Sequence, residues 1–428
     1  MTGDASAEDH EAFGRPQRRD QSGAGMKRGS NLPAVGVYNQ ALVFDLIRRS
    51  EEGLSRSELA EKTGLATQTL SNVTRRLANE GLIHEVGKVI SGPGKPRVLL
   101  ALRPHSRFAV GVHLDPAVDT IVVVNAAGDV VARVEQAPGG ADAEPDRLVG
   151  RIAHSITELI DSVDLRGGHV LGIGVAAPGP FDREAGRLLN PPLLPAWHNV
   201  GVREEIERAS GLPTLLEKDV IATVVGENWF DADQELADAM FLYYGAGLGL
   251  GLSVSGAPVH GRTGNAGNIA HIVVDPAGPL CECGSYGCIG VIMEPRRLLA
   301  EARGSDAGAA ADATRQLELL SNLAAEGDEQ VIRVLEQAAT HLATALVEVN
   351  NLLDLGIVVL GGPAWSRLGG TLFPVLERAV RTTAVSTSTQ TVELRQSQLG
   401  ADSAAVGAGC LVLDEAFTAR TSRLMIAH

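Results

Sequence analysis

The sequence predicts an α/β protein that carries a winged helix-turn-helix in front of a larger α/β body. Residues 31–105 combine helical apolar spacing, a glycine turn and a basic hairpin, which are typical of that module. The chain beyond residue 105 instead alternates apolar strands with amphipathic helices. The charge divides at the same place: residues 31–105 hold 10 Lys and Arg against 7 Asp and Glu, whereas residues 106–428 hold 22 against 40.

Length and composition place the chain among ordinary globular proteins. Its 428 residues are 44% apolar and suffice for two or three domains. We expect no membrane span, because no run of eighteen apolar residues exists, and no signal peptide, because the N-terminus lacks the basic and then apolar pattern. With only four cysteines, a reducing cytoplasm is the expected location.

The N-terminal region divides into a tail and a DNA-binding module. Residues 1–30 are polar and lack apolar periodicity, so we predict a disordered tail there. Residues 31–104 form the expected winged helix-turn-helix, which begins with a helix over residues 35–50.

Two short helices of this module are predicted from a cap and a turn. Ser55 followed by Glu58 forms a capping box, and Gly64 supplies the turn before the second helix. In that second helix Leu70 and Leu77 belong to the buried face. The outward set suits base edges and phosphates of double-stranded DNA, and consists of Thr67, Gln68, Thr69, Ser71, Asn72, Arg75 and Arg76. A solvated polar helix face is the alternative interpretation.

A basic hairpin strengthens the prediction of DNA binding. Strands are expected over residues 82–86 and 98–102, and they bracket the Gly-Pro-Gly-Lys-Pro-Arg segment that ends at Arg97. Such a wing can place Lys95 and Arg97 on a phosphate backbone or in a minor groove.

The body opens with strands over residues 108–114, 120–124 and 130–134, followed by a helix over 147–163 and a strand over 170–176. Later helices are expected near residues 202–210, 220–231, 294–302, 309–325, 329–351 and 403–416, with strands at 214–217, 240–244 and 357–360. Alternating glycines over residues 245–251 either bring backbone N–H groups to a phosphate or mark tight packing.

A cysteine cluster predicts a metal site. Three of the four cysteines, Cys281, Cys283 and Cys288, fall within eight residues, and His271 lies ten positions upstream. Three thiolates and one imidazole satisfy tetrahedral Zn²⁺ and leave no position for a reacting water, so the expected zinc is structural. A redox pair and unrelated thiols are the alternatives.

Together these motifs resemble the ROK family, which joins sugar-responsive transcriptional repressors to sugar kinases. The resemblance covers residues 35–415 and rests on the winged helix, Pro178-Gly-Pro, Lys218-Asp219, the glycine segment, the cysteine cluster and Gly361-Gly362. It implies two ribonuclease H-like (actin-like ATPase and sugar kinase) lobes around a sugar cleft, with zinc bracing a cleft loop. The expected ROK domain spans residues 105–428, with one lobe over 105–225 plus the C-terminal helix and the other over 226–395.

The resemblance also predicts that this chain is not a kinase. Family kinases carry Asp-x-Gly-Gly-Thr after the first strand, whereas this chain has His113-Leu114-Asp115-Pro116-Ala117. Proline has no N–H group and Asp115 adds a negative charge where phosphates would bind. Asp219 matches the family's catalytic base, but we do not expect it to be catalytic.

The cleft departs from the family pattern as well. The expected effector-binding residues are Lys218, Asp219, Asn268 and His271, and two usual glutamates are replaced by Asn268 and Gly290. Because a cation has appeared and carboxylates have gone, we hypothesise an anionic effector such as a sugar phosphate or sugar acid. Alternatively, Lys218 pairs with Glu217 or Asp219 and the cleft binds nothing.

The function expected from these features is a DNA-binding transcriptional regulator, a repressor of carbohydrate-related genes controlled by a sugar-like effector. A homodimer or homotetramer would bind an inverted-repeat operator. The competing hypotheses are a carbohydrate kinase that also binds DNA and an effector-independent DNA-binding scaffold.

Overall fold

The structure, a computed structural model, describes residues 32–89, 97–140, 142–165, 167–304, 312–383 and 392–419. The tail predicted over residues 1–30 lies outside the described residues, and so do the wing tip and its Lys95.

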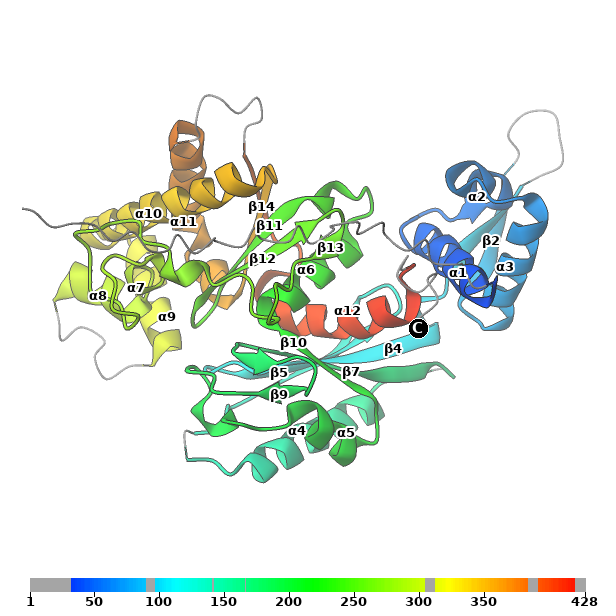
Figure 1. Cartoon of the computed structure of the whole chain (residues 1–428), viewed down its shortest axis with the longest axis horizontal. Helices are drawn as coiled ribbons and strands as arrows, with labels where there is room; N and C mark the ends of the chain where they lie inside the picture. Colours follow the sequence, from blue (N-terminus) through cyan, green and yellow to red (C-terminus); the bar gives the residue numbers. More distant parts are fainter. Residues whose placement is uncertain are drawn as a thin grey trace, which may run out of the picture.

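The N-terminal module is a three-helix winged helix (blue in Figure 1). Its elements are α1 (Leu32–Arg48), β1 (Leu54–Ser55), α2 (Arg56–Thr63), α3 (Thr67–Asn79), β2 (Ile83–Val89) and β3 (Arg97–Leu102). The strands pair antiparallel in the order β1-β3-β2, so a short strand that was not predicted joins the wing. The three helices bury Phe44, Leu59, Leu70 and Leu77 in one core against this sheet.

The first sheet of the body has five strands in the order β10-β7-β4-β5-β6. These are β4 (Arg107–His113), β5 (Asp119–Asn125), β6 (Val130–Gln136), β7 (His169–Ala177) and β10 (Thr214–Lys218). Helices α4 (Pro145–Ser162) and α5 (Val202–Ser210) lie along one face of this sheet, and a short hairpin joins β8 (Phe181–Asp182) to β9 (Arg187–Leu188). Every residue of β5 is buried because the sheet is covered on both faces.

The second sheet also has five strands, in the order β13-β12-β11-β14-β15. They are β11 (Ala239–Tyr244), β12 (Leu248–Val254), β13 (Ala257–Pro258), β14 (Ile357–Gly361) and β15 (Glu393–Gln396). The helices beside them are α7 (Ile289–Ile292), α8 (Pro295–Arg303), α9 (Ala313–Ala325), α10 (Glu329–Leu353) and α11 (Pro363–Thr383). Helix α11 was not predicted, since Pro374 and two glycines weaken its helix propensity, but its apolar face packs in the core through Leu368, Leu372 and Leu376.

Two helices, α6 (Asp219–Phe230) and α12 (Ser403–Phe417), lie between the two sheets (Figure 1). They approach each other and the first sheet at backbone distance. A Cβ atom at Gly407 would lie 2.1 Å from the carbonyl oxygen of Ala222 in α6, and one at Gly174 would lie 1.8 Å from that of Ala408 in α12. Two sheets with this pair of helices between them form the predicted ribonuclease H-like architecture. The boundary expected between residues 225 and 226 falls inside α6.

Among the described residues, no helix combines the length and apolarity needed to cross a membrane.

Candidate functional site

Helix α3 presents a continuous polar surface. Ser55 and Glu58 form both bonds of the predicted capping box at the start of α2, and Gly64 turns the chain with a φ of 68°. The buried side chains of α3 are Leu70, Val73, Thr74 and Leu77. The seven residues predicted to face DNA are all exposed or partly exposed, namely Thr67, Gln68, Thr69, Ser71, Asn72, Arg75 and Arg76.

Contacts within the module orient part of this surface. Nε2 of Gln68 lies 3.4 Å from Oδ1 of Asn72, so the two amides form one hydrogen-bonding edge. Nη1 of Arg76 donates to Oε1 of Gln40 in α1 at 3.3 Å, which turns Arg76 toward the rim of the surface.

Two residues beside α3 were missed in the sequence. A groove of about 430 Å³ is lined by Ser71 and Arg75 of α3 together with Arg56 and His84. Nε of Arg56 donates to Oγ1 of Thr74 at 3.1 Å, which holds the guanidinium next to α3. No sequence signal linked Arg56 to α3, because the contact depends on how α2 packs.

The predicted wing residue Arg97, at the start of β3, is exposed.

The four predicted metal ligands converge. Nδ1 of His271 lies 3.6 Å from Sγ of Cys281, and Sγ of Cys283 lies 3.6 Å from Sγ of Cys288. All four ligand atoms lie within 4.8 Å of one another. A tetrahedral Zn²⁺ with bonds of about 2.3 Å to sulfur and about 2.0 Å to nitrogen spaces its ligands by roughly 3.6–3.8 Å. The cluster could therefore hold such an ion.

The turns of the cluster depend on glycine. Gly284 and Gly287 adopt φ values of 87° and 66°, in the left-handed region. A Cβ atom at Gly287 would lie 1.6 Å from the carbonyl oxygen of Asp275, so no other residue fits there. A hydrogen bond from the backbone of Ser285 lowers the pKa of Cys283 to about 6, whereas burial raises the pKa of Cys288 to about 12, so the free cluster favours the thiolate at Cys283.

A cleft of about 690 Å³ separates the two halves of the body. All four residues predicted to bind an effector line it: Lys218, Asp219, Asn268 and His271. His271 thus belongs both to the metal cluster and to the cleft wall. The lining also includes four residues that the sequence did not single out, Leu193, Leu280, Glu282 and Glu294.

Lys218 is bonded within the protein. Its Nζ donates to the carbonyl oxygens of Asn265 and Ala266, at 3.3 and 2.9 Å, and to Oδ1 of Asn268 at 2.9 Å. These three acceptors match the three donors of an ammonium group, and all lie in the loop before residue 269 rather than on the carboxylates of Glu217 or Asp219. Burial lowers the pKa of Lys218, against the opposing effect of Asp219.

The segment after β4 is closed on itself. Oδ1 of Asp115 accepts the backbone N–H of Ala117 at 2.8 Å, and the intervening Pro116 has no N–H to offer. Asp115, Pro116 and Asp219 all line the cleft. Burial raises the pKa of Asp219, although nearby His113 and Lys218 favour its charged form.

The alternating glycines serve close packing at two positions. Cβ atoms at Gly249 and Gly251 would lie 2.5 and 2.4 Å from side-chain atoms of Val220 and Val224 in α6. Strand β12 therefore packs closely on α6, and Gly247 and Gly249 also line the cleft.

Comparison with known proteins places this architecture in context. The model of the ROK family matches residues 118–415. The DNA-binding transcriptional dual regulator NagC of Escherichia coli K12 and the N-acetylglucosamine repressor of Escherichia coli O6:H1 are each 27% identical to this chain, and each alignment covers 91% of this chain and 95% of the relative. A glucokinase of Thermotoga maritima is 29% identical over 71% of this chain and 96% of its own length.

Among solved structures, a ROK family transcriptional regulator, a homologue of the Escherichia coli MLC protein, superposes with a TM-score of 0.72 at 24% identity, over 90% of this chain and 97% of that one. At this identity the likeness confirms the predicted fold class.

Proposed function

Because this chain belongs to the ROK family, we propose that it is a sugar-responsive transcriptional repressor that binds double-stranded DNA in the cytoplasm through its winged helix. The observation that carries this proposal is the surface of α3, where the amides of Gln68 and Asn72 and the guanidinium of Arg75 face solvent. Amides and guanidinium groups are the donors that read adenine and guanine edges in a major groove.

The relatives support a regulator over an enzyme. The alignment with NagC covers 91% of this chain and must extend into the winged helix, because residues 106–428 make up only about 75% of the 428 residues. The relative thus shares both halves of the architecture. A homodimer or dimer of dimers on an inverted repeat would match the two-fold symmetry common in such regulators.

The segment after β4 argues against phosphotransfer. A phosphate site there would need free backbone N–H groups, but Pro116 has none and the N–H of Ala117 is bonded to Asp115. The carboxylate of Asp115 would also repel a phosphate. A nucleotide-dependent phosphorylation assay on glucose and N-acetylglucosamine should give no product beyond that of Asp219→Asn, and product that requires Asp219 would favour the kinase alternative.

The effector of this repressor would bind in the cleft, contacting Asp219, Asn268 and the neighbourhood of His271. The anionic effector stays a prediction, and two observations weigh against it. The donors of Lys218 are bonded to the loop over residues 265–268, and the other ionisable lining includes Glu282 and Glu294. Thermal-shift measurements with N-acetylglucosamine and its 6-phosphate distinguish the cases, since a larger shift with the phosphate would restore the anionic hypothesis.

The metal proposed for the His271 and cysteine cluster is a structural Zn²⁺. Three sulfurs and one nitrogen fill its tetrahedral shell, so the ion would brace the loop that forms one wall of the cleft. No chemical step is assigned to it.

Genome-wide mapping of bound sites tests the proposed function directly. The wild-type chain should occupy a small set of sites that share one inverted repeat, and Asn72→Ala should lose most of them. Occupancy that is unaffected by Asn72→Ala, or that shows no shared sequence, would contradict recognition through α3. Release from those sites upon growth on a particular sugar would support effector control over an effector-independent scaffold.

A further inference from the structure

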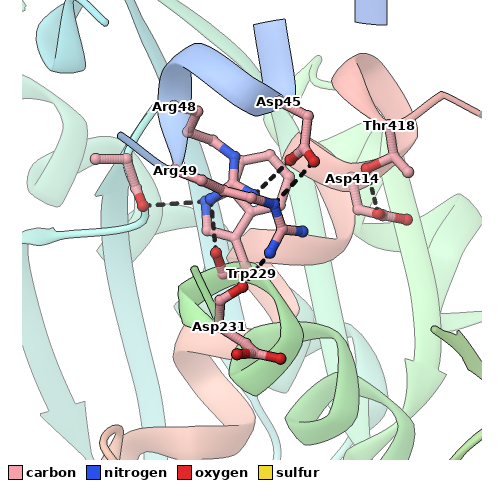
Figure 2. A network of polar contacts seen from close by, with 8 residues as sticks. Asp45, Arg48, Arg49, Trp229, Asp231, Asp414 and Thr418 are labelled. Carbon is pink, nitrogen blue, oxygen red and sulfur yellow. Dashed lines mark hydrogen bonds and ion pairs between the residues drawn. The ribbon is translucent and has the colours of Figure 1, made fainter. Parts of the chain in front are cut away.

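Three helices end at one point between the winged helix and the body. Helix α1 ends at Arg48, α6 at Phe230 and α12 at Phe417. Figure 2 shows Arg48, the last residue of α1, and the following Arg49 reaching the end of α6, with Asp45 beside them. The ring of Phe44 stacks on that of Phe417 with the centroids 4.5 Å apart, so α12 also contacts α1.

The two arginines bind the carbonyl end of α6. Nη1 of Arg48 donates to the carbonyl oxygen of Trp229 at 2.6 Å, and Nη1 of Arg49 donates to that of Asp231. Both guanidinium groups also bond Asp45, at 2.6 and 2.8 Å. Arg48 lies over the ring of Trp229, with Cζ 3.9 Å from the centroid.

We call the contact of Arg48 and Arg49 with Asp45, Trp229 and Asp231 the joint. Its positive charges lie at the negative end of α6. Carbonyl groups at a helix C-terminus carry partial negative charge, so the guanidinium groups of Arg48 and Arg49 are favourably placed at the end of α6. The side chain of Arg48 is only 4% exposed and that of Arg49 only 17%. Buried guanidinium groups in hydrogen bonds hold their partners more firmly than exposed ion pairs do. The joint therefore fixes α1 against α6.

The other end of α6 lies in the cleft. Asp219, its first residue, and the preceding Lys218 both line that cavity, and Lys218 is bonded to the loop over residues 265–268. Between its ends, α6 packs on α12 at backbone distance: a Cβ atom at Gly226 would lie 2.9 Å from Cα of Gly407. Such packing leaves no space for α6 to bend, so its two ends move together.

The connection between the two parts of the protein runs beside the joint. The backbone N–H of Ala126 donates to the carbonyl oxygen of Pro104 in the linker at 2.9 Å, and Nε1 of Trp229 donates to that of Ala127 at 3.0 Å. The turn at Ala126 and Ala127 is thus bonded both to Pro104, between the winged helix and the body, and to Trp229 at the end of α6.

We propose that α6 couples the cleft to the DNA-binding module, with Arg48 and Arg49 as the positioning residues that tie α1 to its far end. A change at Lys218 and Asp219 displaces α6 along with α12, and the joint passes the displacement to α1. The winged helix turns about the linker at Pro104 as a consequence. This coupling goes beyond the proposed function, because it is a mechanical property that exists with or without DNA or sugar.

Hydrogen exchange of the full-length chain, without DNA or sugar, tests the coupling. Four proteins are compared: wild type, Lys218→Met, a joint variant with Arg48→Gln and Arg49→Gln, and the combination. The joint variant should exchange residues 44–50 about tenfold faster or more, while α3 keeps its protection. Arg208→Gln is the control, since it removes an exposed arginine of α5 that bonds Glu204 and Glu205.

The decisive comparison is the effect of Lys218→Met on residues 44–50. We expect faster exchange there in the wild-type background and no further effect in the joint variant. The proposal is overturned if Lys218→Met leaves residues 44–50 unchanged, or changes them equally in both backgrounds. Should Lys218→Met fail to fold, Asn268→Ala replaces it with the same expected outcomes, because it removes one of the three acceptors that hold Lys218.

Discussion

The proposed DNA-binding surface and the cleft use their polar side chains in different ways. On α3, Gln68, Asn72 and Arg75 project into solvent from one short segment. In the cleft, Lys218 is bonded to the loop over residues 265–268, and Asp115 is bonded to its own segment. The first surface is thus available to a large partner, whereas the second is organised by bonds within the protein. Substitutions should accordingly affect binding at the first and local order at the second.

The largest effect is expected at the metal cluster. Cys288→Ser removes one of the four proposed zinc ligands, so metal affinity should fall at least about a hundredfold. Competition with a chromophoric chelator measures this affinity. Cys410→Ser is the control, because Cys410 is buried in α12 outside the cluster. If Cys288→Ser retains the ion as firmly as the control does, the cluster is not its site.

A smaller but specific effect is expected on α3. Asn72→Ala removes an amide that is exposed on α3, so affinity for the operator should fall by about 1–3 kcal/mol and specificity should relax at one base pair. Competition binding against duplexes that vary at each position measures both quantities. Asn351→Ala, at an exposed position in α10, should bind as the wild type does. Equal losses for all duplexes would make Asn72 a phosphate contact.

A buried carboxylate in the first lobe should affect stability without affecting DNA. Burial raises the pKa of Asp119 from 3.8 to about 6. The Asp119 carboxyl group therefore holds its proton more tightly in the folded chain than in the unfolded chain. Its protonated form contributes fully to stability below pH 3.8, and this contribution is lost as the pH rises through about 6. Asp119→Asn should thus increase the free energy of unfolding by about 1–2 kcal/mol at pH 7.5.

Urea unfolding at pH 7.5 and pH 4.5 measures this gain, which should shrink at the lower pH. A gain of equal size at both values would show that ionisation of Asp119 is not its cause. The affinity of Asp119→Asn for the operator should equal that of the wild type, because Asp119 lies in the body and not in the winged helix.

The smallest effect is expected at the wing. Arg97 is exposed at the start of β3, where it would meet a phosphate rather than a base. Arg97→Ala should weaken binding to every duplex alike and reduce the slope of log affinity against log salt by about 1. A loss confined to one sequence would instead assign Arg97 to base recognition.

Features that depend on nearby residues were predictable from the sequence. The cap at Ser55 and Glu58, the turn at Gly64 and the convergence of Cys281, Cys283 and Cys288 each involve contacts over a few positions. Most strands and helices followed from apolar spacing in the same way, but β1, α11 and β15 did not. The two lobes were reached only through the resemblance, because spacing alone does not state which strands pair.

Contacts between residues that are far apart in the sequence were not predictable. Lys218 was expected to face an anion or a neighbouring carboxylate, but its acceptors lie nearly fifty positions away in the chain. Arg48 and Arg49 fall at the end of the helix predicted over residues 35–50 and were not singled out, because their partners at Trp229 and Asp231 follow from the packing of two separate units. The glycines of β12 were ambiguous until Val220 was placed beside them.

Binding of the full-length chain to duplex DNA tests the central claim most directly. A duplex recovered by selection from a random library is compared with a scrambled duplex by fluorescence anisotropy at physiological salt. The account predicts that the selected duplex binds at least about 10³-fold more tightly, and that Asn72→Ala narrows this ratio. Equal affinity for the two duplexes would contradict it.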